Sequence, residues 1–324
     1  MKKMCLQLFR KYDRVACGEI MKNKVRGSLQ LLFATVIWGS AFIAQRAGMD
    51  KLGPFTFQTI RCALALLFLF PTATIVGAKK VGRKQSLRMW LEPELLKSGL
   101  LCGIALFSAS SLQQLGLVET DAGKAGFLTA MYIVLVPLLG VFLGRKPSRS
   151  ALLSVLPAVV GLYLLSWSGS GSLRRGDFLL IACALAFSVQ ITLIDRYAGS
   201  MDGLRLNCIQ SAVVVVLSLP FMLFGESVNA ADIVQCWLPL GYAGVLSMGV
   251  AYTLQITGQR SLEPTAASLI MSLESVFAVL FGFLLLHERL TAREGLGCVL
   301  MFSAVVLSQL PEKQKACPPP AIRS

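Results

Sequence analysis

Histidine and charged residues are scarce in this sequence. Its 324 residues include one histidine, His287, and only 15% of them are Asp, Glu, Lys or Arg, against about 25% in soluble proteins. No two of the nine cysteines are spaced as Cys-x-x-Cys, so the common zinc sites lack ligands. His-Glu-x-x-His, Gly-x-Ser-x-Gly and Walker-type lysine motifs are also missing. We therefore expect no metal site, no cofactor and no ATP-driven step, and an ordinary soluble enzyme is excluded.

Long apolar runs are what the sequence has in abundance. Hydrophobic residues make up 55% of the chain, and the mean hydropathy is +0.67. A helix needs about 20 mainly apolar residues to cross a membrane, and the runs do not alternate as β-barrel strands do. We expect an all-α membrane protein with ten transmembrane helices, at residues 27–47, 56–77, 95–117, 122–144, 149–167, 176–195, 203–224, 236–258, 264–286 and 292–310.

The distribution of basic residues predicts how the chain lies in the membrane. The net charge is +14, from 31 Lys and Arg against 17 Asp and Glu. With a cytoplasmic amino terminus, 23 basic residues fall in cytoplasmic segments and 7 in external ones, as the positive-inside rule expects. We predict both termini to be cytoplasmic in a cytoplasmic (inner) membrane, and no nucleic-acid partner. The cytoplasmic segments are residues 1–26, 79–97, 145–149, 196–205, Arg260 and 313–323.

The two halves of the chain resemble each other. An offset of 142 residues places Leu112-Gln113 on Leu254-Gln255, and an offset of 149 places Pro71 on Pro220. Each half holds five predicted spans, and because five is odd, the second half must enter the membrane from the opposite side. This is the inverted repeat of many secondary transporters. The predicted divisions are a basic segment 1–26, a first repeat 27–168, a linker 169–175, a second repeat 176–310 and a tail 311–324.

Two segments resemble a known family. Residues 34–43 (ATVIWGSAFI), and residues 264–282 (PTAASLIMSLESVFAVLFG) followed by 287–291 (HERLT), are similar to EamA-type transporters of the drug/metabolite transporter superfamily. The resemblance implies two inverted five-helix repeats, with spans five and ten outside a central cavity, and transport of small metabolites. Such proteins often have proline after the glutamate of span nine. Here Ser275 follows Glu274, which leaves the local helix geometry open.

Polar side chains recur at helical spacing in six of the predicted spans. In a membrane such groups must face protein or water, so we expect them to share one cavity, although interhelical hydrogen bonds explain any single stripe equally well. The predicted substrate cavity consists of Trp38, Phe42, Gln45, Gln58, Arg61, Gln113, Gln114, Tyr132, Gln190, Gln210, Tyr252, Gln255 and Glu274.

Two of these residues carry charge at membrane depth, where ionisable groups are costly and usually functional. Glu274 lies about ten residues into its span, and is either a proton carrier or a carboxyl held permanently by a donor on a neighbouring helix. Arg61 either binds a substrate carboxylate or phosphate, or reaches the interface to pair with a loop acid.

The sequence thus predicts a secondary transporter that exports a small polar metabolite, an amino acid or related compound, by alternating access. An exporter of lipophilic or cationic drugs would have a similar lining. An intramembrane enzyme lacks a nucleophile with its base, and a sensor lacks a cytoplasmic domain, so we expect no catalytic residues. The partners we expect are a small-molecule substrate and the lipid bilayer, and the choice between a monomer and a homodimer stays open.

Overall fold

Helices account for the regular structure throughout the part of the chain that is described. The computed structural model describes residues 2–120, 122–166, 174–286 and 291–310, and these ranges contain no strand. The expectation of an all-α protein is confirmed. The first half forms α1 (Lys2–Met49), α2 (Pro54–Val81), α3 (Arg83–Arg88), the 3-10 turn η1 (Met89–Leu91), α4 (Pro93–Glu119), α5 (Ala122–Ala130), α6 (Tyr132–Phe142) and α7 (Arg149–Ser166).

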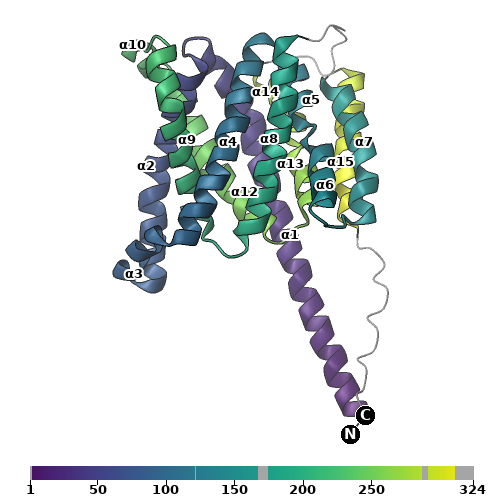
Figure 1. Ribbon diagram of the computed structural model, residues 1–324. Coiled ribbons are helices and arrows are strands. Elements are labelled where there is room, and N and C mark those ends of the chain that lie inside the picture. Colours follow the sequence, from purple (N-terminus) through teal and green to yellow (C-terminus); the bar gives the residue numbers. More distant parts are fainter. Residues whose placement is uncertain (1, 121, 167–173, 287–290, 311–324) are drawn as a thin grey trace.

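The second half repeats this order with one irregular helix. It forms α8 (Arg175–Ala198), α9 (Gly203–Gly225), α10 (Ala230–Gln235), α11 (Trp237–Gly241), the π-helix η2 (Tyr242–Ala251), α12 (Tyr252–Gln259), α13 (Pro264–Met271), α14 (Glu274–Leu286) and α15 (Ala292–Ser308). The long helices lie side by side in one bundle (Figure 1).

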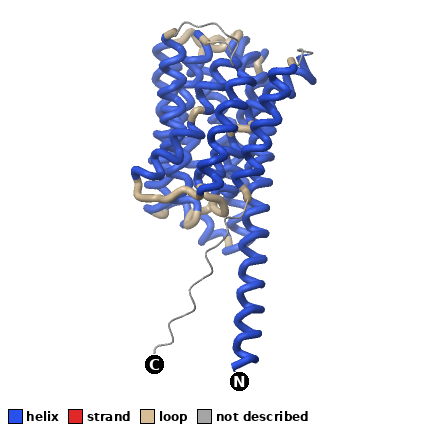
Figure 2. Tube along the Cα trace, turned by 90° about the vertical axis from the view of Figure 1, so that its right-hand side faces the viewer, coloured by secondary structure: helices blue, strands red, loops and turns tan. Residues whose placement is uncertain are grey.

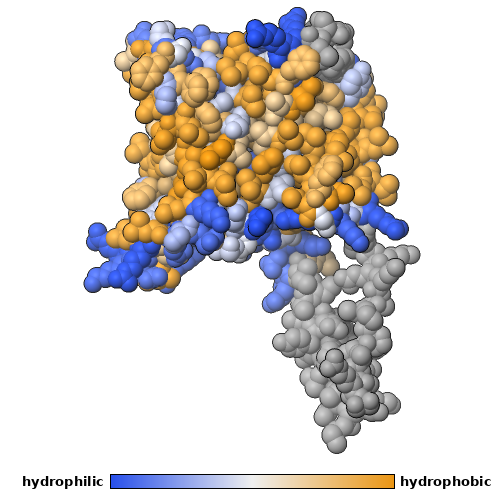
Figure 3. Space-filling model, viewed as in Figure 1, coloured by the Kyte–Doolittle hydropathy of each residue, from blue (hydrophilic) through white to orange (hydrophobic). Residues whose placement is uncertain are grey.

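Seven helical segments of the described chain are long and apolar enough to cross a membrane. The remaining predicted spans, 149–167, 236–258 and 292–310, coincide with α7, with the run α11–η2–α12 and with α15. Apolar side chains cover the visible face of the bundle as a broad belt, with hydrophilic residues at both ends (Figure 3). The seven segments are Met21–Met49, Pro54–Val81, Pro93–Glu119, Ala125–Phe142, Arg175–Ala198, Gly203–Gly225 and Pro264–Leu285.

Two spans that the sequence predicts as continuous helices are broken near their middle. The first break lies at Met131, between α5 and α6, and the second at Ser272 and Leu273, between α13 and α14. At each break the helix tightens: the N–H of Val134 bonds the carbonyl of Met131 at 3.0 Å, and the N–H of Ser275 bonds that of Ser272 at 3.2 Å. The break before Glu274 forms without the proline that the family often has. Helix α14 therefore begins at Glu274.

Glycines let several neighbouring helices touch along their backbones. A Cβ on Gly27 of α1 would lie 2.7 Å from the carbonyl oxygen of Gly258 in α12, and one on Gly258 would lie 2.9 Å from that of Gly27. Gly116 of α4 and Gly176 of α8 meet in the same way, at 3.1 and 3.0 Å. Any larger residue would push these helices apart. Elsewhere α2 packs along α9 and α7 along α15.

Helix α1 continues well beyond the bundle toward the amino terminus (Figures 1 and 2). It begins at Lys2, so the predicted basic segment 1–26 continues without a break into the first span. At about 1.5 Å per residue the extra turns add roughly 37 Å. The predicted linker falls mostly on residues 167–173, which lie outside the described residues, as do residues 287–290 and the tail 311–324.

Candidate substrate cavity

One cavity lies in the middle of the bundle. Its empty volume is about 580 Å³, of which the centres of water molecules can reach about 50 Å³. Helices α1, α2, α4, α6, α8, α12, α13 and α14 and the π-helix η2 supply its walls, whereas α7 and α15 supply none. The lining residues are Trp38, Phe42, Gln45, Arg61, Gln113, Tyr132, Phe187, Gln190, Ile191, Ser247, Met248, Tyr252, Gln255, Met271 and Glu274.

Ten of the thirteen residues predicted for the cavity are in this lining. The other three, all glutamines, lie behind it and bond to neighbouring polar side chains. Gln58 donates to Ser111 Oγ at 3.0 Å, Gln114 to Gln45 Oε1 at 3.4 Å, and Gln210 to Asn207 Oδ1 at 2.8 Å. For these three, the geometry matches the alternative that was left open, a side-chain hydrogen bond within the protein.

Arg61 brings a positive charge into the cavity from α2. Its side chain is buried, with 4% of its surface exposed. Nη1 donates to Gln45 Oε1 at 2.7 Å, and the guanidinium lies 5.7 Å from the centre of the Phe57 ring. Arg61 forms no ion pair within the described ranges, and its Nε has no hydrogen-bond partner there. A buried charge with so few partners is costly for the protein alone, so Arg61 has donor capacity left for a ligand.

Glu274 brings a negative charge from the opposite half of the chain. It is the first residue of α14, where the helix dipole favours a carboxylate. The hydroxyl of Tyr132, the first residue of α6, donates to its Oε1 at 3.4 Å. No basic side chain of the described residues forms an ion pair with it. The two helix breaks thus bring Tyr132 and Glu274, which are 142 residues apart, into contact.

Gly39 lets α1 approach the start of α14 closely. A Cβ at this position would lie 2.9 Å from the carbonyl oxygen of Glu274 and 2.8 Å from the backbone nitrogen of Ala278. The neighbouring residue, Trp38, stacks edge-on against Tyr252, with ring centres 5.0 Å apart. Two aromatic rings therefore stand in the cavity wall that includes Glu274.

Amide groups complete the polar wall. Gln255 Nε2 donates to Gln190 Oε1 at 3.3 Å. Three further polar atoms, Gln190 Nε2, Gln255 Oε1 and Trp38 Nε1, are buried and have no hydrogen-bond partner among the described residues. Buried polar groups are nearly always satisfied in proteins, so these atoms are free to bind a polar ligand.

Five lining residues are not among those predicted from the sequence. Phe187 and Ile191 stand 149 positions after Trp38 and Phe42, so the internal repeat could have located both of them. The other three lining residues are harder to predict from the sequence pattern. Ser247 and Met248 lie in the π-helix, where the 3.6-residue spacing fails, and Met271 lies at the end of α13, just before the break.

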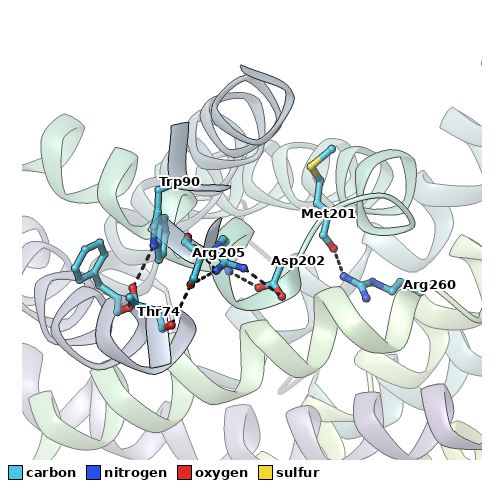
Figure 4. Close-up of polar contacts among 8 residues, drawn as sticks. Thr74, Trp90, Met201, Asp202, Arg205 and Arg260 are labelled. Carbon is cyan, nitrogen blue, oxygen red and sulfur yellow. Dashed lines mark hydrogen bonds and ion pairs between the residues drawn. The ribbon is translucent and has the colours of Figure 1, made fainter. Parts of the chain in front are cut away.

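A second buried arginine is Arg205. The sequence predicts it to lie in the cytoplasmic connection 196–205. It lies in the first turn of α9 and is 2% exposed. Nη2 donates to Ser86 Oγ at 2.9 Å, Nη1 lies 3.7 Å from Asp202 Oδ2, and the guanidinium lies 5.5 Å from the centre of a Trp90 ring (Figure 4). The guanidinium of Arg205 fits here because residue 77 is glycine: a Cβ on Gly77 would lie 2.2 Å from Nη2. Arg205 therefore fastens α9 to the segment after α2.

Comparison with known proteins identifies the family. The family model of the EamA-like transporter family matches residues 25–167 and again residues 174–310. The chain belongs to the EamA-like transporter family. Membership makes it a multi-pass membrane protein from a family of transporters, as the resemblance of residues 34–43 and 264–282 predicted. It also favours transport over catalysis as the role of the cavity.

Relatives of the EamA-like chain extend over nearly its whole length. An uncharacterized transporter of Archaeoglobus fulgidus is 32% identical over 89% of this chain and 87% of its own. The uncharacterized inner membrane transporter YedA of Escherichia coli K12 is 24% identical over 88% of this chain and 90% of its own. A crystal structure that covers 87% of this chain and 96% of its own superposes with a TM-score of 0.69 at 17% identity, which shows a shared fold.

Proposed function

We propose that this EamA-like protein is a secondary transporter that moves an amino acid, or a related small metabolite with both charges, across the cytoplasmic membrane. One observation supports this most. The cavity contains one arginine and one glutamate, Arg61 and Glu274, which form no ion pair with each other or with another described residue. A zwitterion would satisfy both.

The surroundings of the two charges suit the two ends of such a substrate. Arg61 presents guanidinium N–H groups, which bind carboxylates in a fork geometry. Glu274 lies in a wall with Trp38, Tyr132 and Tyr252, and aromatic faces attract ammonium groups. The free amide and indole atoms of Gln190, Gln255 and Trp38 can bond the polar parts between them.

We further propose that ten transmembrane helices form two inverted repeats that work by alternating access. The matching of the family model to each half in turn supports this. The packing supports it as well: the contact of Gly27 with Gly258 corresponds to that of Gly176 with Gly116, at the offsets of 149 and 142. Each contact joins a glycine of the first half to a glycine of the second half, and the offsets convert one contact into the other with the two halves exchanged. A two-fold axis in the membrane plane would relate the two contacts in this way.

The lining residues and the helix breaks of the two halves are related by the same two offsets. Met131 and Leu273, at the two breaks, are 142 residues apart. Four pairs of lining residues also follow the offsets: Trp38 with Phe187, Phe42 with Ile191, Gln113 with Gln255, and Tyr132 with Glu274. Alternating access would open this cavity to each side of the membrane in turn.

For Glu274 we propose proton coupling. Its observed partner is a neutral hydroxyl, that of Tyr132, and a carboxyl without a cationic partner can change its protonation state during the cycle. Replacement by glutamine should weaken exchange of the substrate, because its ammonium group loses a counter-charge, and should remove the response of the remaining transport to a pH gradient. The proposed direction is export, with both termini cytoplasmic.

A second candidate function has one observation in its favour. The aromatic wall near Glu274 also fits an organic cation without a carboxylate, as an exporter of lipophilic or cationic drugs would require. Arg61 distinguishes the two candidates, because only a substrate with a carboxylate uses it.

Counterflow in proteoliposomes tests the proposal. Vesicles loaded with one amino acid at a time are assayed for uptake of its labelled form, and each amino acid is paired with the amine that lacks its carboxylate. We expect counterflow of at least one amino acid and much less of its amine. Arg61→Ala should abolish that counterflow, whereas Arg145→Ala, at an exposed arginine paired with Asp195, should not.

Adjacent glutamines give a finer control. Gln113 lines the cavity and Gln114 does not, so Gln113→Ala should raise the concentration needed for half-maximal uptake more than Gln114→Ala. If Arg61→Ala left amino-acid counterflow unchanged, the zwitterion proposal would be wrong. If organic cations were then carried in a manner that depends on Glu274, the second candidate would stand.

A further inference from the structure

The segment that follows α2 is strongly basic and exposed. Between Lys79 and Leu91 the sequence has five basic residues and no acidic one. All five side chains are exposed, and none forms an ion pair within the described residues. We name residues 79–91 the basic shelf. Its basic residues are Lys79, Lys80, Arg83, Lys84 and Arg88.

Apolar side chains of the basic shelf are exposed beside these charges. Val81, Leu87 and Leu91 are all solvent-exposed, Leu91 at 75%. The shelf includes α3, which juts out below the apolar belt as a hydrophilic projection at the lower left (Figures 1 and 3). Basic residues mixed with apolar ones at the edge of a membrane are typical of surfaces that lie in the headgroup region.

The basic shelf is held firmly against the transport helices. Ser86 Oγ donates to the carbonyl of Thr74 at 3.0 Å, and Trp90 Nε1 donates to Thr74 Oγ1 at 3.1 Å. Arg205 adds the bond from α9 to Ser86. Gly82, with φ of 84°, lets the chain turn sharply out of α2. The charges are therefore presented at a defined place and not on a free loop. Figure 4 shows the contacts of Thr74, Trp90 and Arg205 that hold the segment.

The corresponding segment at the other end of the bundle lacks this charge. Residues 226–238 follow α9 as the shelf follows α2, and contain no Lys or Arg. They also expose apolar side chains, among them Val234 and Trp237, but their charged residues are Glu226 and Asp232. The fold thus needs a covering segment at this position but not a basic one, so the charge of the shelf serves orientation in the membrane, contact with a charged partner, or both.

We propose that the basic shelf binds the phosphate headgroups of anionic phospholipids in the leaflet that it meets. Charge complementarity and the exposed apolar residues both point to this occupant. Glu92 and Glu94 follow at the start of α4 and confine the positive surface to the shelf itself. Each basic residue near an anionic surface raises lipid affinity by about fivefold.

Trp90 is a built-in reporter of lipid at the shelf. The protein is reconstituted in phosphatidylcholine that contains a small share of spin-labelled phosphatidylglycerol or spin-labelled phosphatidylcholine, with the nitroxide near the headgroup end of the acyl chain. The quenching of Trp90 fluorescence is obtained by subtracting the quenching measured for Trp90→Phe from that measured for the wild-type protein. We expect phosphatidylglycerol to quench severalfold more strongly at equal mole fraction.

Two variants with equal loss of charge test where the lipid binds. Arg83→Gln/Lys84→Gln/Arg88→Gln should bring the two lipids to equal quenching, whereas Lys22→Gln/Lys24→Gln/Arg26→Gln, in exposed turns of α1, should leave the preference intact. Equal quenching by both lipids in the wild-type protein would overturn the proposal. So would an equal loss in the α1 variant, or displacement of the lipid by inorganic phosphate at constant ionic strength.

Discussion

Two buried arginines occupy neighbouring helices and have opposite surroundings. Arg61 on α2 and Arg205 on α9 are 4% and 2% exposed, and their helices pack side by side. The terminal nitrogens of Arg205 reach a serine hydroxyl, a serine carbonyl and a carboxylate, whereas those of Arg61 reach one amide oxygen. In both, Nε has no hydrogen-bond partner among the described residues, so the difference lies at the ends of the guanidinium groups.

This difference separates an anchoring arginine from one that can bind a ligand. The partners of Arg205 engage both of its terminal nitrogens and tie α9 to the basic shelf. Arg61 faces a cavity, and its charge has no counter-ion within the described part of the chain. Neither charge recurs in the other half, where Gln210 and Thr56 stand at the matching positions. The halves therefore share architecture and differ in charge.

The largest expected effect is on transport when Arg61 is replaced. Arg61→Ala should lower the uptake rate of the proposed substrate at least about 30-fold, because losing a charged contact in a buried site costs about 2–5 kcal/mol. Its melting temperature in detergent should change little, since one protein hydrogen bond is lost. Uptake assays and thermal melts of the same preparation check this. A large fall in melting temperature would make Arg61 an anchor like Arg205.

Arg205→Ala should show the reverse pattern. We expect a loss of about 2–3 kcal/mol of stability, because the buried hydrogen bonds to Ser86 and the ion pair with Asp202 are lost, while Asp202 keeps only the backbone N–H of residue 205. Transport per folded molecule should stay near normal. Arg145→Ala is the matched control, since its ion pair with Asp195 is at the surface and is worth at most about 1 kcal/mol. Equal melting temperatures for the two variants would contradict the anchoring role.

Gly77→Ala changes the surroundings of Arg205 and leaves those of Arg61 unchanged. The added methyl group would displace the guanidinium from Ser86, at a cost of about 1–2 kcal/mol. In an Arg205→Ala background part of this cost should disappear, because the guanidinium that the methyl group meets is gone, whereas Ser86 Oγ, 2.5 Å from the added Cβ, remains. A double-mutant cycle on thermal melting measures the coupling. Additive effects would mean that Gly77 acts independently of Arg205.

Ser86→Ala should have the smallest effect. It removes one hydroxyl, which accepts from Arg205 and donates to the carbonyl of Thr74, while the backbone carbonyl of Ser86 still lies 3.3 Å from Arg205 Nη2. We expect a loss of about 1 kcal/mol, measured by chemical or thermal unfolding, and unchanged uptake. A loss of uptake as large as that of Arg61→Ala would show that the shelf takes part in substrate binding.

Much of the cavity could be predicted from spacing because the membrane constrains polar groups so strongly. Polar stripes at helical spacing must face inward, and this placed Gln45, Gln113 and Glu274 in the lining. The same reasoning also selected Gln58, Gln114 and Gln210, because a polar side chain faces inward whether it meets a cavity or another helix. Spacing cannot distinguish these two environments, which differ only in what the neighbouring helix presents.

The amino-acid sequence by itself determined the helical class, the family, and the apolar segments that cross the membrane, since each depends on composition and local order. Tertiary structure alone decided where helices break, at Met131 and before Glu274, and which arginine is anchored. These features depend on contacts between residues far apart in the chain, such as Tyr132 with Glu274 or Ser86 with Arg205. A charge counted along the chain predicts its side of the membrane, whereas its role follows from the groups that surround it.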